Sequence, residues 1–440
     1  MVLLLRKFWA NKMEIQGVKS LNGEIRVPGD KSISHRSAII SSISGGRVII
    51  ENYLFSQDCI NTIEILKNLG VKIENIDNDL MIHGVKTGNM VEPRAVLDVG
   101  NSGTAIRLIA GVLASTGFMS ILSGDDSINN RPMKRIIDPL RSMGASVYGR
   151  DNNKKAPLVI FGNKKLQGKR FEFSLSSAQL KSCILLAGIN AEGVTEIIQP
   201  ETSRDHTERM LQYFGADIEF DGKYTRLDPL NGLEARNIYI PGDISSAAFI
   251  IVATLILKNS HTLIRDVGIN PTRDHFIEIL IKMGANIEIK NKRTISNEPV
   301  ADIETFSSDL NSVEIEKQWI PNIIDEIPVL AVAASRASGK TIIEGAGELR
   351  NKESDRISAL CTQLKKIGVD IREQKDGFEI IGNSNNDITG GTVESMGDHR
   401  IAMSLAILSL LSNNTTTILD SDCIDTSFPD FKYILKKLMA

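Results

Sequence analysis

The sequence has few cysteines and no long apolar run, and each absence excludes a class of protein. Four cysteines lie far apart among the 440 residues and match neither a zinc-binding nor a redox spacing. A reduced chain in the cytoplasm is the economical interpretation. The longest apolar run, residues 247–257, is too short to cross a bilayer, and the first residues lack the apolar core and cleavage site of a signal peptide. We therefore expect no membrane association.

Neither sign of charge dominates the sequence. Lys and Arg total 51, Asp and Glu total 54, and the net charge is −3. A bulk nucleic-acid binder usually carries a basic excess, so we expect no nucleic-acid partner. The six histidines show neither an HxH nor an HExxH spacing, so no metal site is predicted. Gly339-Lys340-Thr341 is not a phosphate-binding loop, because Ala334 stands where that pattern requires glycine.

What the chain does have is an internal repeat. Five helix-like stretches end in a glycine followed by an alternating, strand-like run; the glycines are Gly70, Gly144, Gly215, Gly284 and Gly368. A second pattern occurs six times: a polar cluster, a helix apolar on nearly every face, and a short β-branched strand. The six helices are expected at about residues 34–44, 103–115, 178–191, 245–258, 325–338 and 398–412. Helices apolar on all faces are buried on all faces, so these six should form the core.

Two copies of Pro-Gly-Asp indicate where the chain passes between two domains. They begin at Pro28 and Pro241, which are about three repeat lengths apart. We predict one domain of three repeats at residues 30–240 and a second that combines residues 241–440 with residues 1–29. Hinges are expected near Pro28-Gly29 and Pro241-Gly242. The last repeat lacks its strand, which residues 13–18 could supply, and residues 1–12 look like a dispensable extension.

Cations occur in or beside the polar clusters that open the six core helices. Ser, Asp and Gly at such positions are favoured as N-caps, and capping is the simpler interpretation for each of them taken singly. Cations in a first turn, however, oppose the helix dipole unless an anion compensates. The cations are Lys31, Arg36, Arg107, Arg131, Lys352, Arg356 and Arg400. Because helix N-termini and arginines both bind anions, the pattern predicts a pocket for multiply charged anions.

Other motifs leave two interpretations open. Asp325 and Glu326 open a helix among these cations, where they either cap it or supply a general base held ionised by positive charge. Residues 348–356 place Lys352 and Arg356 on one helical face beside Glu353, as a surface ion-pair ladder or as part of the site. Residues 202–206 (TSRDH) and 271–275 (PTRDH) are repeat-equivalent, so at least one copy should be structural.

In their order and spacing, the motifs resemble the EPSP synthases, or 3-phosphoshikimate 1-carboxyvinyltransferases. They include VPGDKSISHR, VGNSGTAIR, SSAQLKSCILLAG, TSRDHTERML, DEIPVLAVAA, ELRNKESDRI, GDHRIAM and TSFPDF. The resemblance spans about residues 15–438 and implies an α/β fold of two domains, built from six βαβαββ repeats with buried parallel helices. It also implies transfer of the carboxyvinyl group of phosphoenolpyruvate to the 5-hydroxyl of shikimate 3-phosphate, in chorismate and aromatic amino acid biosynthesis. The enzyme would be a cytoplasmic monomer that uses no metal or organic cofactor.

Carried over motif by motif, the resemblance implies three overlapping sets of site residues. In the catalytic set, Asp325 accepts the 5-hydroxyl proton, Lys31 donates a proton to the methylene group, and Glu353 is a second acid or base. The shikimate 3-phosphate set comprises Lys31, Ser32, Arg36, Ser177, Gln179, Ser203, Arg204, Asp325 and Lys352. The phosphoenolpyruvate set comprises Lys31, Gly103, Arg131, Gln179, Arg356 and Arg400.

The sequence departs from the family pattern at two places. Some members carry a lysine where this chain has Asp425-Thr426-Ser427, which leaves a phosphoenolpyruvate contact from that loop open. Ala178 replaces a serine found in the other sequence class. Two rival functions also remain. The sibling UDP-N-acetylglucosamine carboxyvinyltransferase is disfavoured because residues 124–134 contain no counterpart of its catalytic cysteine. A non-catalytic ring-shaped scaffold of six β/α repeats would leave the cations and Asp325 unexplained.

Overall fold

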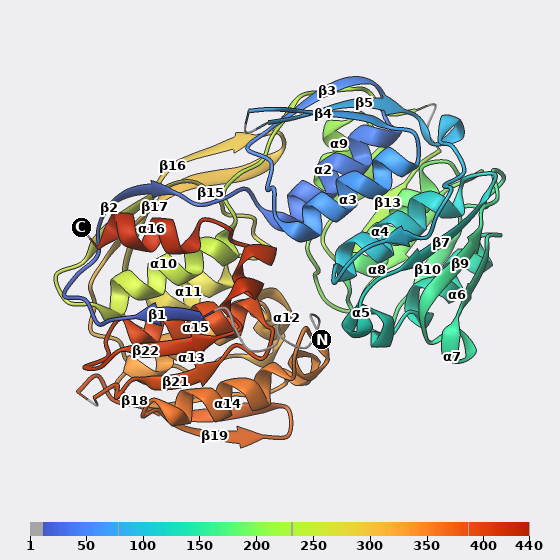
Figure 1. Cartoon of the computed structure of the whole chain (residues 1–440). Coiled ribbons are helices and arrows are strands. Elements are labelled where there is room, and N and C mark those ends of the chain that lie inside the picture. The colour runs from blue at the N-terminus through green and yellow to red at the C-terminus, as the bar shows by residue number, and fades with distance from the viewer. Residues whose placement is uncertain (1–11, 78, 230–231, 386, 440) are drawn as a thin grey trace, which may run out of the picture. The chain divides into compact units, whose positions relative to one another are not determined.

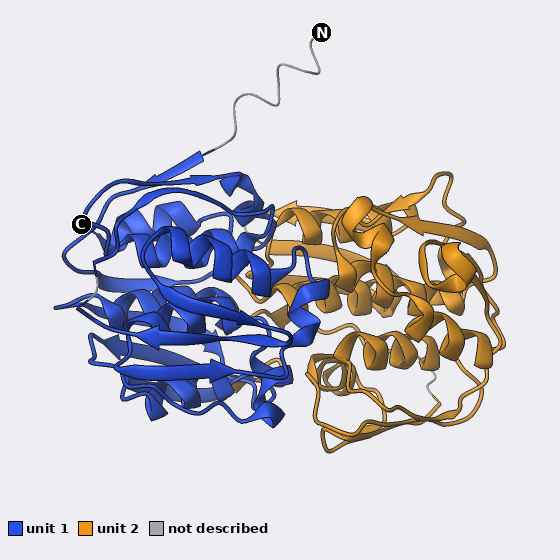
Figure 2. Ribbon diagram, turned by 90° about the horizontal axis from the view of Figure 1, so that it is seen from below, with its two compact units in different colours: residues 1–28, 242–293, 299–440 blue, residues 29–241, 294–298 orange. Residues whose placement is uncertain are grey.

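The structure, a computed structural model, describes residues 12–77, 79–229, 232–385 and 387–439 (Figure 1). The chain divides into two compact units, coloured separately in Figure 2. Unit 1 combines the residues up to Pro28 with Gly242–Arg293 and the chain from Pro299 onward, and unit 2 comprises Gly29–Pro241. Unit 2 also includes Thr294–Glu298, the tip of a hairpin whose strands lie in unit 1. The sequence did not indicate this exchange.

Each unit contains three of the six core helices, and these helices are buried, as their apolar pattern predicts. In α10, every residue from Ile244 to Leu255 is buried. The core helices of unit 2 are α2 (Lys31–Ile43), α4 (Gly103–Ala114) and α8 (Ala178–Gly188). Those of unit 1 are α10 (Ile244–Ile256), α13 (Ile327–Arg336) and α15 (His399–Ser409). The six predicted core helices are therefore confirmed.

A short strand follows each core helix and joins a small sheet of three or four strands. These strands are β3 (Gly45–Glu51), β7 (Met119–Ser123), β11 (Thr195–Ile198), β15 (His261–Gly268), β18 (Gly339–Ile343) and β22 (Thr416–Leu419). Five sheets also receive a strand parallel to the post-helix strand, namely β2 (Asn22–Arg26), β6 (Leu97–Asp98), β10 (Arg170–Glu172), β14 (Ile238–Tyr239) and β21 (Gly391–Glu394). The predicted strand positions are confirmed.

A second, outer helix follows in each repeat. These helices are α3 (Gln57–Asn68), α6 (Lys134–Ser142), α9 (His206–Tyr213), α11 (His275–Lys282), α14 (Arg356–Lys366) and α16 (Phe431–Leu438). The first five end at the predicted glycines, whose φ angles of +85° to +108° are left-handed and favour glycine. Shorter helices are α5 (Asp126–Asn130), α7 (Arg150–Asn153) and α12 (Ile320–Ile323).

An antiparallel hairpin follows each of those five outer helices and completes a sheet. The hairpins are β4 (Lys72–Ile76) with β5 (Asp79–Val85), β8 (Ser146–Gly149) with β9 (Lys155–Phe161), β12 (Ile218–Phe220) with β13 (Tyr224–Leu227), β16 (Asn286–Ile295) with β17 (Glu298–Phe306), and β19 (Asp370–Gln374) with β20 (Gly377–Gly382). The β16–β17 hairpin has strands of 10 and 9 residues, whereas the other four have strands of 3 to 7 residues.

The N-terminal segment completes the sixth repeat, as expected. β1 (Lys12–Ile15) pairs antiparallel with β22, and β2 (Asn22–Arg26) pairs parallel with β15. The strand differs from the expected range of 13–18, because Lys12 is already paired with Leu419. The prediction that residues 1–12 are an extension is therefore wrong for Lys12, which belongs to the fold. Residues 1–11 lie outside the described part of the chain.

The two Pro-Gly-Asp copies are hydrogen-bonded to each other in a reciprocal way. The amide of Asp30 donates to the carbonyl of Pro241 at 2.8 Å, and the amide of Asp243 donates to the carbonyl of Pro28 at 2.9 Å. Each aspartate also caps a core helix, since Asp30 accepts from the amide of Ile33 and Asp243 from that of Ser245. Among the described residues, no helix is long and apolar enough to span a bilayer.

Candidate active site

In unit 2, the N-termini of the three core helices meet through their side chains. His35 of α2 lies 3.4 Å from the hydroxyl of Ser102, the N-cap of α4, measured from Nε2 to Oγ. Arg107 of α4 donates from Nη1 to Oε1 of Gln179, in the first turn of α8, at 2.6 Å. Burial lowers the pKa of His35 to about 3, so its imidazole is neutral near pH 7. The predicted grouping of polar clusters at one end of a domain is thus confirmed for unit 2.

Lys31 and Arg36 project from the first turns of α2. Lys31 Nζ forms an ion pair with Asp58 Oδ2 at 2.9 Å. Arg36 is buried and donates to three neutral oxygen atoms: Thr207 Oγ1 at 2.7 Å, the Ser32 carbonyl at 2.9 Å and Ser182 Oγ at 2.9 Å. Burial lowers the pKa of Arg36 to about 10, which leaves it charged at neutral pH. Its hydrogen-bond partners fix the side chain without neutralising it.

Gly103, the first residue of α4, lies between two arginines. A Cβ atom at this position would lie 2.9 Å from Nη1 of Arg107 and 2.9 Å from Nη1 of Arg131. Arg131 Nη2 donates to Asn101 Oδ1 at 3.0 Å. Two guanidinium groups therefore converge on one helix N-terminus, where the dipole is also positive, and an anion would relieve their repulsion.

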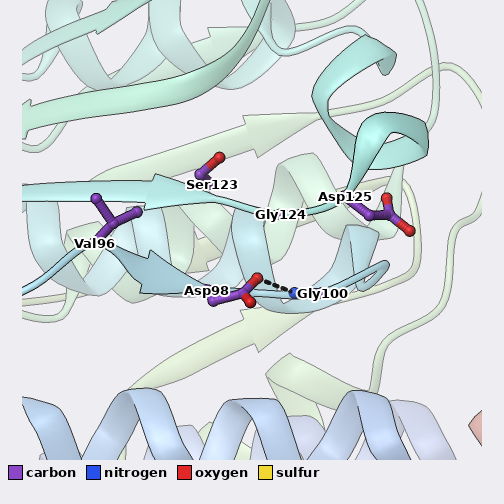
Figure 3. A pocket seen from close by; sticks show the side chains of 6 residues that line it. All are labelled: Val96, Asp98, Gly100, Ser123, Gly124 and Asp125. Carbon is purple, nitrogen blue, oxygen red and sulfur yellow. Dashed lines mark hydrogen bonds between the residues drawn. The ribbon is translucent and has the colours of Figure 1, made fainter. Parts of the chain in front are cut away.

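A pocket of about 420 Å³ lies beside this loop, and Figure 3 shows the residues that line it. Asp98 accepts a hydrogen bond from the amide of Gly100 at 2.8 Å, and Asp125 accepts from Asn101 Nδ2 at 2.6 Å. Two carboxylates in the lining make the pocket unsuitable for an anion. Their hydrogen bonds instead hold the loop that presents Asn101 to Arg131.

The remaining predicted residues of unit 2 lie at the start of α8 and in the loop before α9. The hydroxyl of Ser177 accepts from the amide of Leu180 at 3.4 Å and caps α8. Gln179 Nε2 donates to Thr104 Oγ1 at 3.1 Å, which links α8 to α4. The hydroxyl of Ser203 donates to Gln199 Oε1 at 2.6 Å, and the half-buried Arg204 follows it.

In unit 1, Asp325 lies in the turn between α12 and α13 and faces two cations. Its Oδ1 is 3.5 Å from Arg356 Nη1 and 3.6 Å from Lys352 Nζ. The side chain is 16% exposed, so it is accessible from solvent. A partly exposed carboxylate stabilised by two cations is suited to accept a proton from a bound hydroxyl.

Arg356 is the most deeply buried cation of this cluster. Its Nε donates to Asp398 Oδ2 at 2.8 Å and its Nη2 to Glu353 Oε2 at 2.6 Å. Burial would lower the pKa of Arg356, but Asp398, Glu353 and Asp325 outweigh it and raise the pKa above its ordinary value. Its Nη1 has no hydrogen-bond partner among the described residues. A buried donor of this kind is costly to leave unpaired, which favours a ligand acceptor there.

Glu326 lies in a different environment from its neighbour Asp325. It is fully buried, accepts from the Ser245 hydroxyl and lies 3.8 Å from Arg273 Nη2 and 3.9 Å from Arg400 Nη1. Arg273 also donates to Ser245 Oγ at 2.6 Å. The PTRDH copy that contains Arg273 is therefore structural, as expected of at least one copy. Arg400 Nη1 donates to the Asp325 carbonyl at 2.6 Å, so the N-termini of α13 and α15 also meet.

The family model of EPSP synthase (3-phosphoshikimate 1-carboxyvinyltransferase) matches residues 15–435. The chain belongs to the EPSP synthase family. A 3-phosphoshikimate 1-carboxyvinyltransferase of Petrotoga mobilis is 49% identical over 98% of this chain and 100% of its own length. A 3-phosphoshikimate 1-carboxyvinyltransferase of Syntrophomonas wolfei is 48% identical over 96% of this chain and 98% of its own length. The solved EPSP synthase of Acinetobacter baumannii has a TM-score of 0.87 at 40% identity, covering 97% of this chain and 98% of that one.

The partners of the predicted cations were missed by sequence reasoning. Asp58, Thr207 and Asp398 lie 27, 171 and 42 residues from the cations that they hold. Asp398 lies in the polar cluster before α15, for which the sequence leaves capping and anion binding open, but its pairing with Arg356 has no local signal. Asp58 and Thr207 gave no signal, because their importance depends on contacts that only the fold creates.

The two departures from the family pattern are visible in the structure. Thr426 Oγ1 donates to the Cys423 carbonyl at 2.6 Å and lies 3.4 Å from His399 Nδ1. Ala178 is the first residue of α8. Burial raises the pKa of Cys59, Cys183 and Cys361 to about 12 and that of Cys423 to about 11, so no thiol is poised as a nucleophile or acid. The described residues contain no group of three or more His, Cys, Asp or Glu placed to hold a metal.

Proposed function

We propose that the chain transfers the carboxyvinyl group of phosphoenolpyruvate to the 5-hydroxyl of shikimate 3-phosphate and releases phosphate. Membership in the EPSP synthase family supports the reaction, since relatives at 49% and 48% identity carry the corresponding name. The observation that carries the proposal is the position of Asp325 between Arg356 and Lys352, at 3.5 and 3.6 Å. This arrangement supplies a base beside two anion-binding groups.

Shikimate 3-phosphate is assigned to residues with hydroxyl, amide and cationic groups. Arg36 is suited to its phosphate or carboxylate, because its protein partners are neutral and leave its charge uncompensated by direct contact. The full set is Lys31, Ser32, Arg36, Ser177, Gln179, Ser203, Arg204, Asp325 and Lys352.

Phosphoenolpyruvate, with a phosphate and a carboxylate, is assigned to the arginine-rich set. The convergence of Arg107 and Arg131 on Gly103 supports this assignment, as does Nη1 of Arg356, which has no hydrogen-bond partner among the described residues. The full set is Lys31, Gly103, Arg131, Gln179, Arg356 and Arg400.

The chemistry is an addition followed by an elimination. Asp325 takes the proton of the 5-hydroxyl while the hydroxyl oxygen of shikimate 3-phosphate bonds to C2 of phosphoenolpyruvate. Lys31 gives a proton to the C3 methylene. The resulting tetrahedral adduct then loses a proton from C3 and expels phosphate, which restores the double bond. Glu353, held by Arg356 at 2.6 Å, is the second acid or base. The cations stabilise the anionic groups throughout.

The domain assignment also remains a proposal. We assign residues 1–29 with 241–440 to one domain and residues 30–240 to the other, with hinges near Pro28-Gly29 and Pro241-Gly242. The reciprocal hydrogen bonds of Asp30 and Asp243 support two crossings that act as a pair. Four unpaired cysteines support a reducing, cytoplasmic location, and we propose a monomer that needs no metal or cofactor.

Calorimetric titration separates the candidate functions. We expect saturable binding of shikimate 3-phosphate and none of UDP-N-acetylglucosamine. Arg36→Gln should weaken the binding at least ~10-fold, because hydrogen bonds to charged groups contribute about 1.5–3 kcal/mol. The matched control is Arg170→Gln, which removes an exposed arginine that pairs with Glu172 at the surface. Binding of the UDP-sugar alone would move the chain to the sibling activity, and binding of neither would favour a scaffold.

A further inference from the structure

The β16–β17 hairpin is longer than its four counterparts, and its tip belongs to the other unit. At about 3.3 Å per residue, its 10-residue strand extends about 33 Å, roughly twice the length of the next longest first strand. The strands leave unit 1 after Arg293 and return at Pro299. Ser296 and Asn297 both have positive φ angles, of 49° and 66°, which is the geometry of a tight hairpin turn.

The hairpin tip contacts α9 of unit 2 through a buried pair. Glu298 Oε1 lies 2.8 Å from His206 Nδ1, and the side chains of Glu298 and His206 are 5% and 2% exposed. His206 is the first residue of α9 and follows the Ser203–Arg204 loop by two positions. A carboxylate buried at this depth is costly unless its partner is held in place.

Asn297 adds two hydrogen bonds to the same helix. Its Nδ2 donates to the carbonyl of Arg209 at 3.0 Å and to Gln212 Oε1 at 2.9 Å. Ser296 accepts a hydrogen bond from the amide of Tyr239 at 3.0 Å, two residues before the Pro241 crossing. Glu298 and Asn297 therefore both hold α9, and Ser296 holds the segment before the Pro241 crossing.

Helix α9 in turn holds residues assigned to shikimate 3-phosphate. Thr207, its second residue, accepts from Arg36 Nε at 2.7 Å. The loop that carries Ser203 and Arg204 leads directly into the helix. A shift of α9 would therefore displace Arg36, Ser203 and Arg204 together, whereas Gly103 and Arg131 are held by other elements.

We infer that Glu298 and Asn297, at the tip of the β16–β17 hairpin, are positioning residues for the shikimate 3-phosphate site. They act through α9 on Ser203, Arg204 and Arg36, and they need not contact the substrate. The inference rests on the proposed function of those three residues. The inference explains the unusual length of this hairpin, because only a long hairpin brings the side chains of Glu298 and Asn297 to α9.

The test compares tip variants with a matched change in the same hairpin. Glu298→Ala should raise the Kd of shikimate 3-phosphate by ~10-fold to ~100-fold, since losing a hydrogen bond to a charged group has an effect of this size. The KM of phosphoenolpyruvate and kcat should change far less. Glu298→Gln keeps a hydrogen-bonding group near His206 Nδ1 and should retain most of the wild-type affinity for shikimate 3-phosphate. Glu288→Gln, an exposed residue paired with Lys290, should leave all three constants unchanged.

Two further variants keep the inference falsifiable. If Glu298→Ala does not fold, Asn297→Ala, which removes two hydrogen bonds at a partly exposed position, should raise the same Kd alone. In a double-mutant cycle, the effect of Glu298→Ala should shrink in a Ser203→Ala background, because both act on one loop. The inference would be overturned if the affinity for shikimate 3-phosphate did not change, or if the KM of phosphoenolpyruvate rose by the same factor. It would also be overturned if the effects of Glu298→Ala and Ser203→Ala multiplied independently. A wild-type protein that fails to bind shikimate 3-phosphate would overturn the proposed function as well.

Discussion

Arg356 and Asp398 form an ion pair that is shielded from solvent. Arg356 Nε and Asp398 Oδ2 are 2.8 Å apart, and the side chains are 1% and 0% exposed. The pair fixes one edge of the guanidinium, Glu353 fixes a second position, and Nη1 remains without a hydrogen-bond partner among the described residues. This geometry makes Asp398 the residue that fixes the orientation of the Arg356 guanidinium.

Asp398→Ala should therefore destabilise the fold by about 3–5 kcal/mol, because removing one partner leaves a buried charge unpaired. Glu373→Ala is the matched control: Glu373 pairs with Arg350 at 2.9 Å but is 39% exposed, so its loss should cost less than about 1 kcal/mol. Urea unfolding of the two variants measures the difference. Equal effects would show that burial of the Asp398 pair is not what holds Arg356.

Asp325→Asn should lower kcat by ~100-fold or more, since a positioned base contributes ~10²–10⁴. The affinity for shikimate 3-phosphate should change much less, because the amide keeps the size and hydrogen-bonding capacity of the carboxylate. Steady-state kinetics and calorimetry on one protein sample give both values. A kcat within a few-fold of wild type would remove Asp325 as the base.

Gly103→Ala should raise the KM of phosphoenolpyruvate several-fold without unfolding the protein. The added Cβ meets the ends of two flexible side chains, Arg107 and Arg131, which can move aside but then leave the anion site. Gly88→Ala is the control, because a Cβ there would meet nothing within 4 Å. If the KM of phosphoenolpyruvate is the same in both variants, the convergence of the two arginines does not form the site.

Stability should fall in acid through His35. Burial lowers its pKa to about 3 from an ordinary value of 6.5, so the unfolded chain binds a proton below pH 6.5 that the folded chain refuses. The stabilisation is complete above pH 6.5 and is lost as the pH falls toward 3. At pH 5 the loss in the free energy of unfolding is about 2 kcal/mol. His35→Gln should reduce the loss of Tm between pH 8 and pH 5. Equal slopes for wild type and His35→Gln would contradict this account.

The repeat was predictable because its signals are local. Gly215 and Gly368 end helices in the left-handed region, and α10 is apolar on every face, so neighbouring residues suffice to identify each element. Contacts between distant residues were not predictable. Ser245 and Glu326 are 81 residues apart and His206 and Glu298 are 92 apart, yet each pair is buried and hydrogen-bonded. Likewise, Lys12 joins β1 only because Leu419 lies opposite it.

Phosphate release from phosphoenolpyruvate, with and without shikimate 3-phosphate, tests the central claim most directly. The purified full chain should release phosphate only when both compounds are present, in a one-to-one ratio with loss of phosphoenolpyruvate, and UDP-N-acetylglucosamine should not replace shikimate 3-phosphate. Release that is independent of shikimate 3-phosphate, or that depends on the UDP-sugar instead, would contradict the assigned reaction.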